Sequence, residues 1–442
     1  MSSPGHALYL LLTMLMLLAG CREEAEEQTR PAATAATRLP EPATATPPTT
    51  VLATTTLATT RLPPTPTTLP PTATVALPTL TPTPAYPVYT GPTLSRSDIG
   101  VQVHSHRQDL GQLFGHLEAL GVGWVKVQVS WKLHQPYPDR YSDEYFGELD
   151  NLVALANAHQ VAVLLSVAKA PEWSRPTTEL DGPPRDYTLY RTFMQHLAGR
   201  YQGRVAAYEL WNEANLQREW NGVPLSAADL VALMREGAAG VGAADPDAIL
   251  VSGAPATTGI NDGVVAIDDR LYLRQMLAAG VTDIVDAIGA HPYGWANPPD
   301  SSAGAPDPAV PSHNNHPSFF FGDTLMDYAA ILDEFGSNTT PIWVTEFGWG
   351  TFETFSNDLG TPVAPPAGAE FMATVSEWQQ ASYILRAYEL AHESDRVGPM
   401  FLWNLNFGPL LGTGFSEAGY SLLRPDGSPR PAYLALQAAP KQ

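Results

Sequence analysis

Eight short apolar runs alternate with amphipathic stretches from Ile99 to the C-terminus, and this rhythm constrains the fold more than any other feature. The stretches between the runs show the spacing of helices with one apolar face. Strands and helices in strict alternation build a parallel sheet of the α/β class through right-handed crossovers. Eight repeats predict a closed (β/α)8 (TIM) barrel, with a doubly wound open sheet as the alternative. The runs cover residues 99–104, 123–131, 161–167, 205–212, 248–253, 285–291, 341–347 and 398–404, and the helical stretches cover 109–120, 142–159, 186–201, 226–242, 271–280, 323–335 and 375–393.

The second run favours the barrel over the open sheet, because apolar and polar residues alternate from Val125 to Ser130. A central strand of an open parallel sheet is apolar on both faces. In a barrel, one face meets the helices and the other fills the interior. We therefore expect Lys126 and Glu209 to meet inside the barrel as an ion pair. The other polar side chains expected in the interior are Gln128, Ser130, Gln102 and His104.

The chain divides into three parts by composition. Residues 1–21 are mostly apolar, and residues 22–95 contain 22 Thr and 15 Pro. Such a tract cannot bury a core, so we expect a disordered tether, extended by its prolines. Residues 96–442 have ordinary globular composition and form the predicted barrel domain, from about Ser97 to about Ala438.

The N-terminal part predicts export. The apolar run 8–18 has the length of a signal segment and is too short to span a bilayer. It ends in Leu18-Ala19-Gly20-Cys21, which resembles the bacterial lipobox. That resemblance implies a lipoprotein signal peptide over 1–21 and a lipid on Cys21. The protein would then be anchored on the extracellular face of a bacterial membrane, at the cell surface or in the periplasm. No Lys or Arg precedes the run, and a plain cleaved signal remains the alternative.

Charge and cysteine content limit the partners. The formal net charge is −21, and nearly all of it lies in residues 96–442, so binding to nucleic acid is excluded. A neutral ligand fits this surface better than a polyanion does. One cysteine forms no disulfide within the chain. No sequence feature calls for a cofactor or an obligate protein partner.

Two glutamates stand where apolar runs open into the expected barrel mouth. Glu213 follows the fourth run in Trp211-Asn212-Glu213, and Glu346 closes the seventh in Thr345-Glu346-Phe347. The chemistry of such barrels lies at the C-terminal ends of the strands, where two distant glutamates can converge. Paired carboxylates that flank a bond are what glycoside hydrolysis requires.

These motifs resemble the retaining glycoside hydrolases with catalytic glutamates on strands four and seven. Residues 211–216 are similar to the Trp-Asn-Glu-Pro-Asn-Leu of family 39, with Ala214 in place of proline, and residues 346–349 resemble family 5 cellulases. The resemblance implies Glu213 as acid/base, Glu346 as nucleophile, and Asn212 as the ligand of the sugar 2-hydroxyl. It also implies a hydrogen bond from Tyr293 to the nucleophile.

Further substrate-binding residues were sought at the other strand ends. In the resemblance, His291 and Tyr293 follow strand six, and Trp403 lies under the sugar. Aromatic rings pack on the C–H faces of sugars. Seven tryptophans fall at strand ends or in the following loops, namely 131, 173, 211, 220, 295, 349 and 403, and Trp131 and Trp349 were the further binding candidates among them. We expect His104 to contact a sugar hydroxyl, and the loops 296–321 and 351–374 to shape the cleft.

Two other functions stay open. His104 and His106 resemble the two-histidine entry of metal-dependent amidohydrolase barrels, which Lys169 and His291 would extend. The fifth run offers no histidine and the eighth ends in Asn404 without an aspartate, so that metal set is incomplete and no metal is predicted. A lectin on a decayed barrel is the non-enzymatic alternative.

The hydrolase hypothesis predicts a distance between the two carboxyl groups and the direction of a pKa shift. Retention of configuration requires carboxyl groups about 5–5.5 Å apart, whereas inversion requires about 6.5–9.5 Å. At the shorter distance, the charge of Glu346 is expected to raise the pKa of Glu213 and to keep it protonated. The sequence does not identify the sugar.

Overall fold

The computed structural model describes residues 85–357 and 359–442. The expected signal peptide over 1–21, its Cys21 and most of the expected tether over 22–95 therefore lie outside the described residues.

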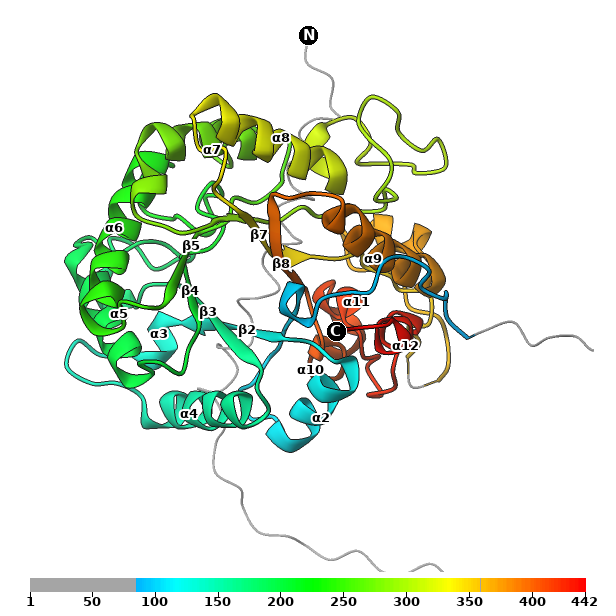
Figure 1. Ribbon diagram of the computed structural model, residues 1–442, viewed down its shortest axis with the longest axis horizontal. Coiled ribbons are helices and arrows are strands. Elements are labelled where there is room, and N and C mark those ends of the chain that lie inside the picture. The colour runs from blue at the N-terminus through cyan, green and yellow to red at the C-terminus, as the bar shows by residue number, and fades with distance from the viewer. Residues whose placement is uncertain (1–84, 358) are drawn as a thin grey trace, which may run out of the picture. The chain divides into compact units, whose positions relative to one another are not determined.

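Eight parallel strands form the centre of the domain (Figure 1). Their order is β5-β4-β3-β2-β1-β8-β7-β6, and the ring closes through a parallel bridge between Val251, in β5, and Ala287, just before β6. This closure confirms the predicted (β/α)8 barrel and excludes the open sheet. The strands are β1 (Ile99–Gln102), β2 (Trp124–Ser130), β3 (Ala162–Ala168), β4 (Ala207–Leu210), β5 (Ile249–Ser252), β6 (Ile288–Ala290), β7 (Ile342–Phe347) and β8 (Val397–Leu402).

Helices surround the strands, and the sequence explains where several of them begin and end. The Asp109 side chain accepts the Gln112 N–H at the start of α2, and Gly121, with φ 64°, ends that helix in the left-handed conformation. Ser376 and Gln379 form a capping box at the start of α9. The helices are α2 (Leu110–Leu120), α3 (Trp131–His134), α4 (Asp143–Ala158), α5 (Thr188–Arg200), α6 (Ala227–Ala244), α7 (Asp269–Ala278), α8 (Phe321–Glu334), α9 (Glu377–His392), α10 (Phe407–Leu411), α11 (Glu417–Tyr420) and α12 (Pro431–Ala438).

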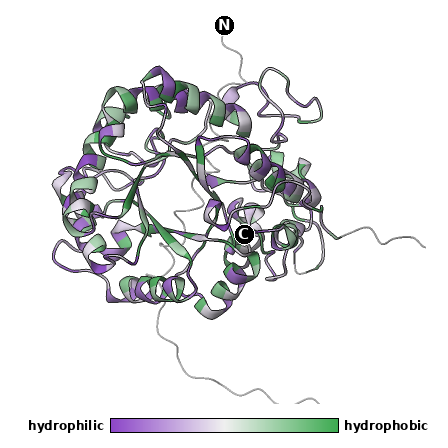
Figure 2. Cartoon of the chain, viewed as in Figure 1, coloured by the Kyte–Doolittle hydropathy of each residue, from purple (hydrophilic) through white to green (hydrophobic). Residues whose placement is uncertain are grey.

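Polar side chains occupy part of the barrel interior, as the alternation in β2 predicted. Lys126 and Glu209 are fully buried, and Lys126 Nζ lies 3.1 Å from Glu209 Oε2. Apolar residues fill the space between the strands and the helices, and the strands are largely green in Figure 2. The Lys126–Glu209 ion pair therefore lies in a low-dielectric setting, where its charges interact strongly.

The packed domain begins before the expected boundary at residue 96. Tyr89 and Leu94 are buried in the main core. Leu94 also forms a parallel bridge with Lys441, so the two ends of the domain lie side by side. Residues 85–95, which we assigned to the tether, are thus in part a component of the barrel domain.

The two long loops after β6 and β7 share a small core of their own. Ala296 and Val310 of the first loop pack with Phe352, Phe355 and Phe371 of the second. Their position after β6 and β7 puts this small core beside the C-terminal ends of those strands.

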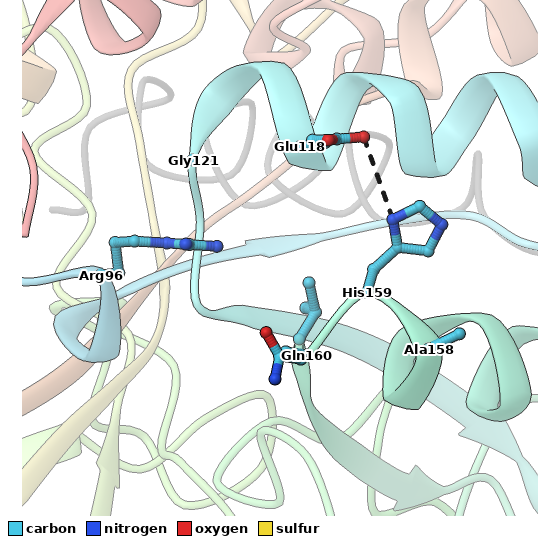
Figure 3. A pocket seen from close by; sticks show the side chains of 7 residues that line it. Arg96, Glu118, Gly121, Ala158, His159 and Gln160 are labelled. Carbon is cyan, nitrogen blue, oxygen red and sulfur yellow. Dashed lines mark ion pairs between the residues drawn. The ribbon is translucent and has the colours of Figure 1, made fainter.

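A surface pocket lies at the opposite end of the barrel. It is lined by residues that precede the strands, among them Arg96 before β1 and Gly121 before β2, together with Glu118 and His159 (Figure 3). Barrel enzymes carry their chemistry at the other face, so this pocket is separate from the candidate site. Among the described residues, no helix combines the length and the apolar character needed to cross a membrane.

Candidate active site

Glu346 lies in β7, and its side chain contacts groups from β1, β2 and the segment after β6. Its Oε1 lies 3.1 Å from Lys126 Nζ, and its Oε2 accepts a hydrogen bond of 2.8 Å from the hydroxyl of Tyr293. With the Gln102 amide oriented so that its nitrogen faces Glu346, Gln102 donates to Oε1 over 3.0 Å. The hydrogen bond from Tyr293 that the resemblance implied is therefore present.

Glu213 stands on a tight turn just after β4. Trp211 and Glu213 have φ values of 82° and 43°, in the left-handed region that few residues other than glycine adopt. The Glu213 N–H donates to Ala254 O across 2.9 Å, which ties the turn to the segment after β5. Gly253 permits this approach, because a Cβ there would lie 2.7 Å from the Leu210 carbonyl oxygen. The strained turn carries Glu213 back over the barrel mouth.

The two glutamates converge on His291. Its Nδ1 lies 3.1 Å from Glu213 Oε1 and 3.9 Å from Glu346 Oε2. One oxygen of each carboxylate and one ring nitrogen of His291 all lie within 4.8 Å of one another. These two carboxylate oxygens thus lie closer together than the roughly 6.5–9.5 Å that separates the carboxyl groups of inverting glycosidases.

The expected rise in the pKa of Glu213 is wrong. Burial does raise the pKa of Glu213, but the guanidinium of Arg218, 2.5 Å from Oε2, and the ring of His291 outweigh it. The net direction is a pKa below that of an ordinary glutamate, which favours the ionised form of Glu213. The expected rise rested on the charge of Glu346 alone, whereas the arginine five positions beyond Glu213 acts in the opposite direction.

His291 responds in the opposite direction. Burial lowers its pKa, while the charges of Glu346 and Glu213 and a hydrogen bond with Glu213 raise it, and the net shift is upward. The ring is fully buried, so it contacts the two carboxylates rather than solvent. The expectation that His291 binds the substrate is corrected: it bridges the glutamates.

With this geometry in view, the comparisons decide the family. The model of the cellulase family, glycosyl hydrolase family 5, matches residues 95–364, which include Glu213 and Glu346. The chain belongs to glycosyl hydrolase family 5. Its barrel is that of a glycoside hydrolase.

Several solved structures of glycoside hydrolases have a similar barrel at low sequence identity. A family 39 glycoside hydrolase from Bacteroides cellulosilyticus WH2 matches with TM-score 0.58 and 21% identity over 79% of this chain and 65% of that one. An exo-beta-1,4-mannosidase from Opitutaceae bacterium strain TAV5 gives 0.50 and 14% over 80% and 60%. A GH10 endoxylanase from a sugarcane soil metagenome gives 0.51 and 16% over 78% and 96%.

These matches establish the fold, and this chain spans less than two thirds of the length of the family 39 enzyme and of the mannosidase. No curated protein matches the chain.

Most of the tryptophans that we associated with sugar binding belong to the core of this family 5 barrel. Trp131 and Trp349 are fully buried; Trp131 packs on Tyr190 and Phe193, and Trp349 donates its indole N–H to Asn297 O. Neither ring can meet a sugar, so both assignments are corrected. Trp211 and Trp220 are equally buried, while Trp173, Trp295 and Trp403 keep partly exposed faces.

Trp403, the expected sugar platform, lies close to the two glutamates through its neighbours. It follows β8, is half-buried, and its ring contacts those of Tyr293 and Tyr420 edge to face. Its indole N–H donates to Gln102 over 3.2 Å when that amide also donates to Glu346. An unbroken set of contacts thus links Trp403 to Glu346.

The histidines of the metal alternative have other partners. His106 Nδ1 lies 2.6 Å from Glu148 Oε2, and Lys169 pairs with Asp181. The ring of His104 packs against Phe407, which also contacts Trp403, and burial is the main cause that lowers its pKa to about 4. His104 is therefore neutral and lies one ring away from Trp403, while His291 belongs to the glutamates.

Three residues that contact the two glutamates were not predicted to do so. Lys126 and Gln102 were expected inside the barrel but not in contact with Glu346, and no sequence pattern pointed to Arg218.

Asn212 is buried, and its Oδ1 has no hydrogen-bond partner among the described residues. A buried acceptor of this kind suits a donor from a ligand, such as a sugar hydroxyl.

Proposed function

We propose that this protein is a retaining glycoside hydrolase that cleaves O-glycosidic bonds of an oligo- or polysaccharide by double displacement. Glu346 is the nucleophile and Glu213 is the acid/base. The observation that carries the proposal is the approach of the two carboxylates to within 4.8 Å around His291. A close approach of this kind supports retention, because inverting enzymes hold a water between carboxyl groups that lie further apart.

In the first step, a Glu346 oxygen attacks the anomeric carbon and the bond to the leaving oxygen breaks. The bonding electron pair goes to the leaving oxygen, which takes a proton from Glu213. Lys126 and Tyr293 orient Glu346 for this attack, because both donate a hydrogen bond to its carboxylate. In the second step, Glu213 takes a proton from water, the water oxygen attacks the same carbon, and Glu346 leaves.

A β-linked substrate is the finer part of the proposal. The matching family model is described as a cellulase, and one solved neighbour is described as an exo-beta-1,4-mannosidase. Trp403 would pack on the sugar ring and Asn212 would accept a hydrogen bond from the 2-hydroxyl. A panel of nitrophenyl α- and β-glycosides tests the linkage and the sugar together. Cleavage of an α-glycoside alone would contradict the β assignment.

We further propose that the mature protein is anchored outside a bacterial membrane by a lipid on Cys21. The support is the apolar run 8–18 followed by Leu-Ala-Gly-Cys. Two acyl chains would give a stable anchor where a single chain would not. Mass spectrometry of the native N-terminus tests this: a diacylated Cys21 supports the anchor, and an unmodified Cys21 or cleavage elsewhere contradicts it.

A lectin is the remaining alternative to an enzyme. A lectin needs no pair of carboxyl groups at a fixed distance, whereas a retaining hydrolase needs one as the nucleophile and the other as the acid/base. Turnover of any nitrophenyl glycoside that is lost in Glu346→Gln decides for the hydrolase, and saccharide binding without turnover decides for the lectin.

A further inference from the structure

Arg218 binds two carboxylates at the barrel mouth. Its Nη2 lies 2.5 Å from Glu213 Oε2, and its Nη1 lies 3.2 Å from Glu219 Oε1. The side chains of Glu213 and Glu219 are 12% and 11% exposed, so water reaches both while the protein covers most of each. A catalytic and a non-catalytic glutamate therefore share one cation.

We infer that Arg218 is a positioning residue for proton transfer, and that as the common counter-ion of Glu213 and Glu219 it couples them, so that protonation of one favours ionisation of the other. This inference rests on the acid/base role proposed for Glu213. It assigns functions to Arg218 and Glu219, which neither the sequence motifs nor the spacing of the two catalytic carboxylates requires.

The loop after β4 fixes the two carboxyl groups relative to each other. The Glu219 N–H donates to Leu216 O, and the indole N–H of Trp211 donates to the Glu219 carbonyl. The Asn221 N–H donates to Asp181 O, which ties the end of the loop to the segment after β3. The backbone is thus held at both ends, and the long side chain of Arg218 is the group that can turn between the two glutamates.

The electrostatics of Glu219 and Glu213 differ in direction. Burial is the main cause that raises the pKa of Glu219, and the charges of Asp181 and Glu213 add to it, against Arg218 and Lys169. The pKa of Glu213 lies below its ordinary value, since burial is outweighed by Arg218, His291 and Lys126. The charges of Glu346 and Glu417 also raise the pKa of Arg218. The two shifts have opposite directions, so Glu219 holds a proton more tightly than Glu213 does.

The first catalytic step needs the opposite arrangement. Glu213 must carry the proton, which it takes from solvent. Arg218 would then lie in the site without a carboxylate in direct contact, and an unpaired buried charge is costly. The ionised form of Glu219 reduces this cost, because it pairs with Arg218. When the leaving group takes the proton from Glu213, Arg218 returns to it, and Glu213 is ready to act as the base.

Three variants test the inference through pH profiles. They are Glu219→Gln, Arg218→Met and, as matched control, Arg274→Met, whose exposed guanidinium binds Glu334. On a phenyl glycoside, which needs a proton, Arg218→Met is expected to move the basic limb of kcat/KM up by about 1–3 pH units. Glu219→Gln moves it down by about one unit, because glutamine cannot ionise to pair with Arg218. The control leaves the limb in place.

A dinitrophenyl glycoside separates proton supply from damage to the site. Its leaving group needs no proton, so Glu219→Gln leaves the rate of the first step within about twofold of the parent, as expected for a group that acts only through the proton. Equal losses on both substrates, or a basic limb that does not move, overturn the inference. Glutamine nearly matches glutamate in shape, so this variant keeps the test valid if Arg218→Met does not fold.

A titration that needs no activity completes the test. Carboxyl ¹³C NMR of glutamate-labelled protein should give a lower pKa for Glu219 in Glu213→Gln than in the parent, and a higher one in Arg218→Met. An unchanged pKa for Glu219 in Glu213→Gln overturns the inference even in an active enzyme. If Glu213 and Glu219 titrate together in a protein that cleaves no glycoside, the coupling through Arg218 is supported and the proposed function is refuted.

Discussion

The hydroxyl of Tyr293 donates a hydrogen bond to Oε2 of Glu346 across 2.8 Å. This bond joins the segment after β6 to the carboxylate of β7, and it leaves Oε1 to Lys126. Tyr293→Phe removes the donor and keeps the ring that contacts Trp403. A hydrogen bond to a charged group contributes about 1.5–3 kcal/mol, so we expect kcat/KM to fall roughly 10- to 100-fold.

Glu213→Ala is expected to divide substrates by their leaving group. Dinitrophenyl glycosides need no proton, so the first step proceeds and the glycosyl-enzyme accumulates, because the base for the second step is missing. Phenyl glycosides lose the first step as well, by roughly 10²–10⁴-fold. Stopped-flow kinetics with both substrates measures this, and equal losses on the two would contradict the acid role.

Lys126 is expected to control stability as well as activity. It pairs with Glu209 and Glu346, and Lys126→Met leaves the fully buried Glu209 without that cation. Removing one partner of a buried pair costs about 3–5 kcal/mol, which urea unfolding measures. The double variant Lys126→Met/Glu209→Gln should recover most of the loss. The exposed pair of Arg386 with Asp300 is the control, and Arg386→Met should cost at most about 1 kcal/mol.

Substitutions of Trp403 and Trp131 are expected to distinguish a ring that binds substrate from one that packs in the core. Trp403→Ala should raise KM or lower kcat for every glycoside that the enzyme accepts, since its exposed face is available to a sugar. Trp131→Ala should lower the free energy of unfolding by about 3–5 kcal/mol, because the ring is fully buried. Its kinetic constants, measured well below the unfolding temperature, should stay near those of the parent. The reverse pattern would contradict the placement of these rings.

The fold was predictable because its signals are local and repeated. The alternation in β2 predicted the interior position of Lys126 and its pairing with Glu209, and the eight runs match the eight strands within a few residues at each end. A barrel repeats one strand–helix unit, so an error at one boundary does not change the topology.

The site was predictable only where a residue stands at a strand end. Glu213, Glu346, Tyr293 and Trp403 meet this condition. Arg218 does not, because a loop brings it back to Glu213 and no periodicity describes a loop. Its charge reverses the expected shift in the pKa of Glu213.

The assignment of the buried tryptophans to sugar binding was wrong for a different reason. Trp131 and Trp349 also stand at strand ends, but their rings turn into the space between strands and helices. Position along the chain does not distinguish a ring over the barrel mouth from one beneath it, since both follow a strand directly.

The stereochemistry of the first product tests the central claim most directly. Proton NMR, recorded during hydrolysis of a nitrophenyl glycoside before the sugar mutarotates, should show the product with the configuration of the substrate. Glu346→Ala, inactive alone, should form the glycosyl azide of inverted configuration when azide is added, because azide attacks from the face that the carboxylate leaves empty. A first product of inverted configuration from the parent enzyme would contradict a covalent intermediate on Glu346 and, with it, the proposed double displacement.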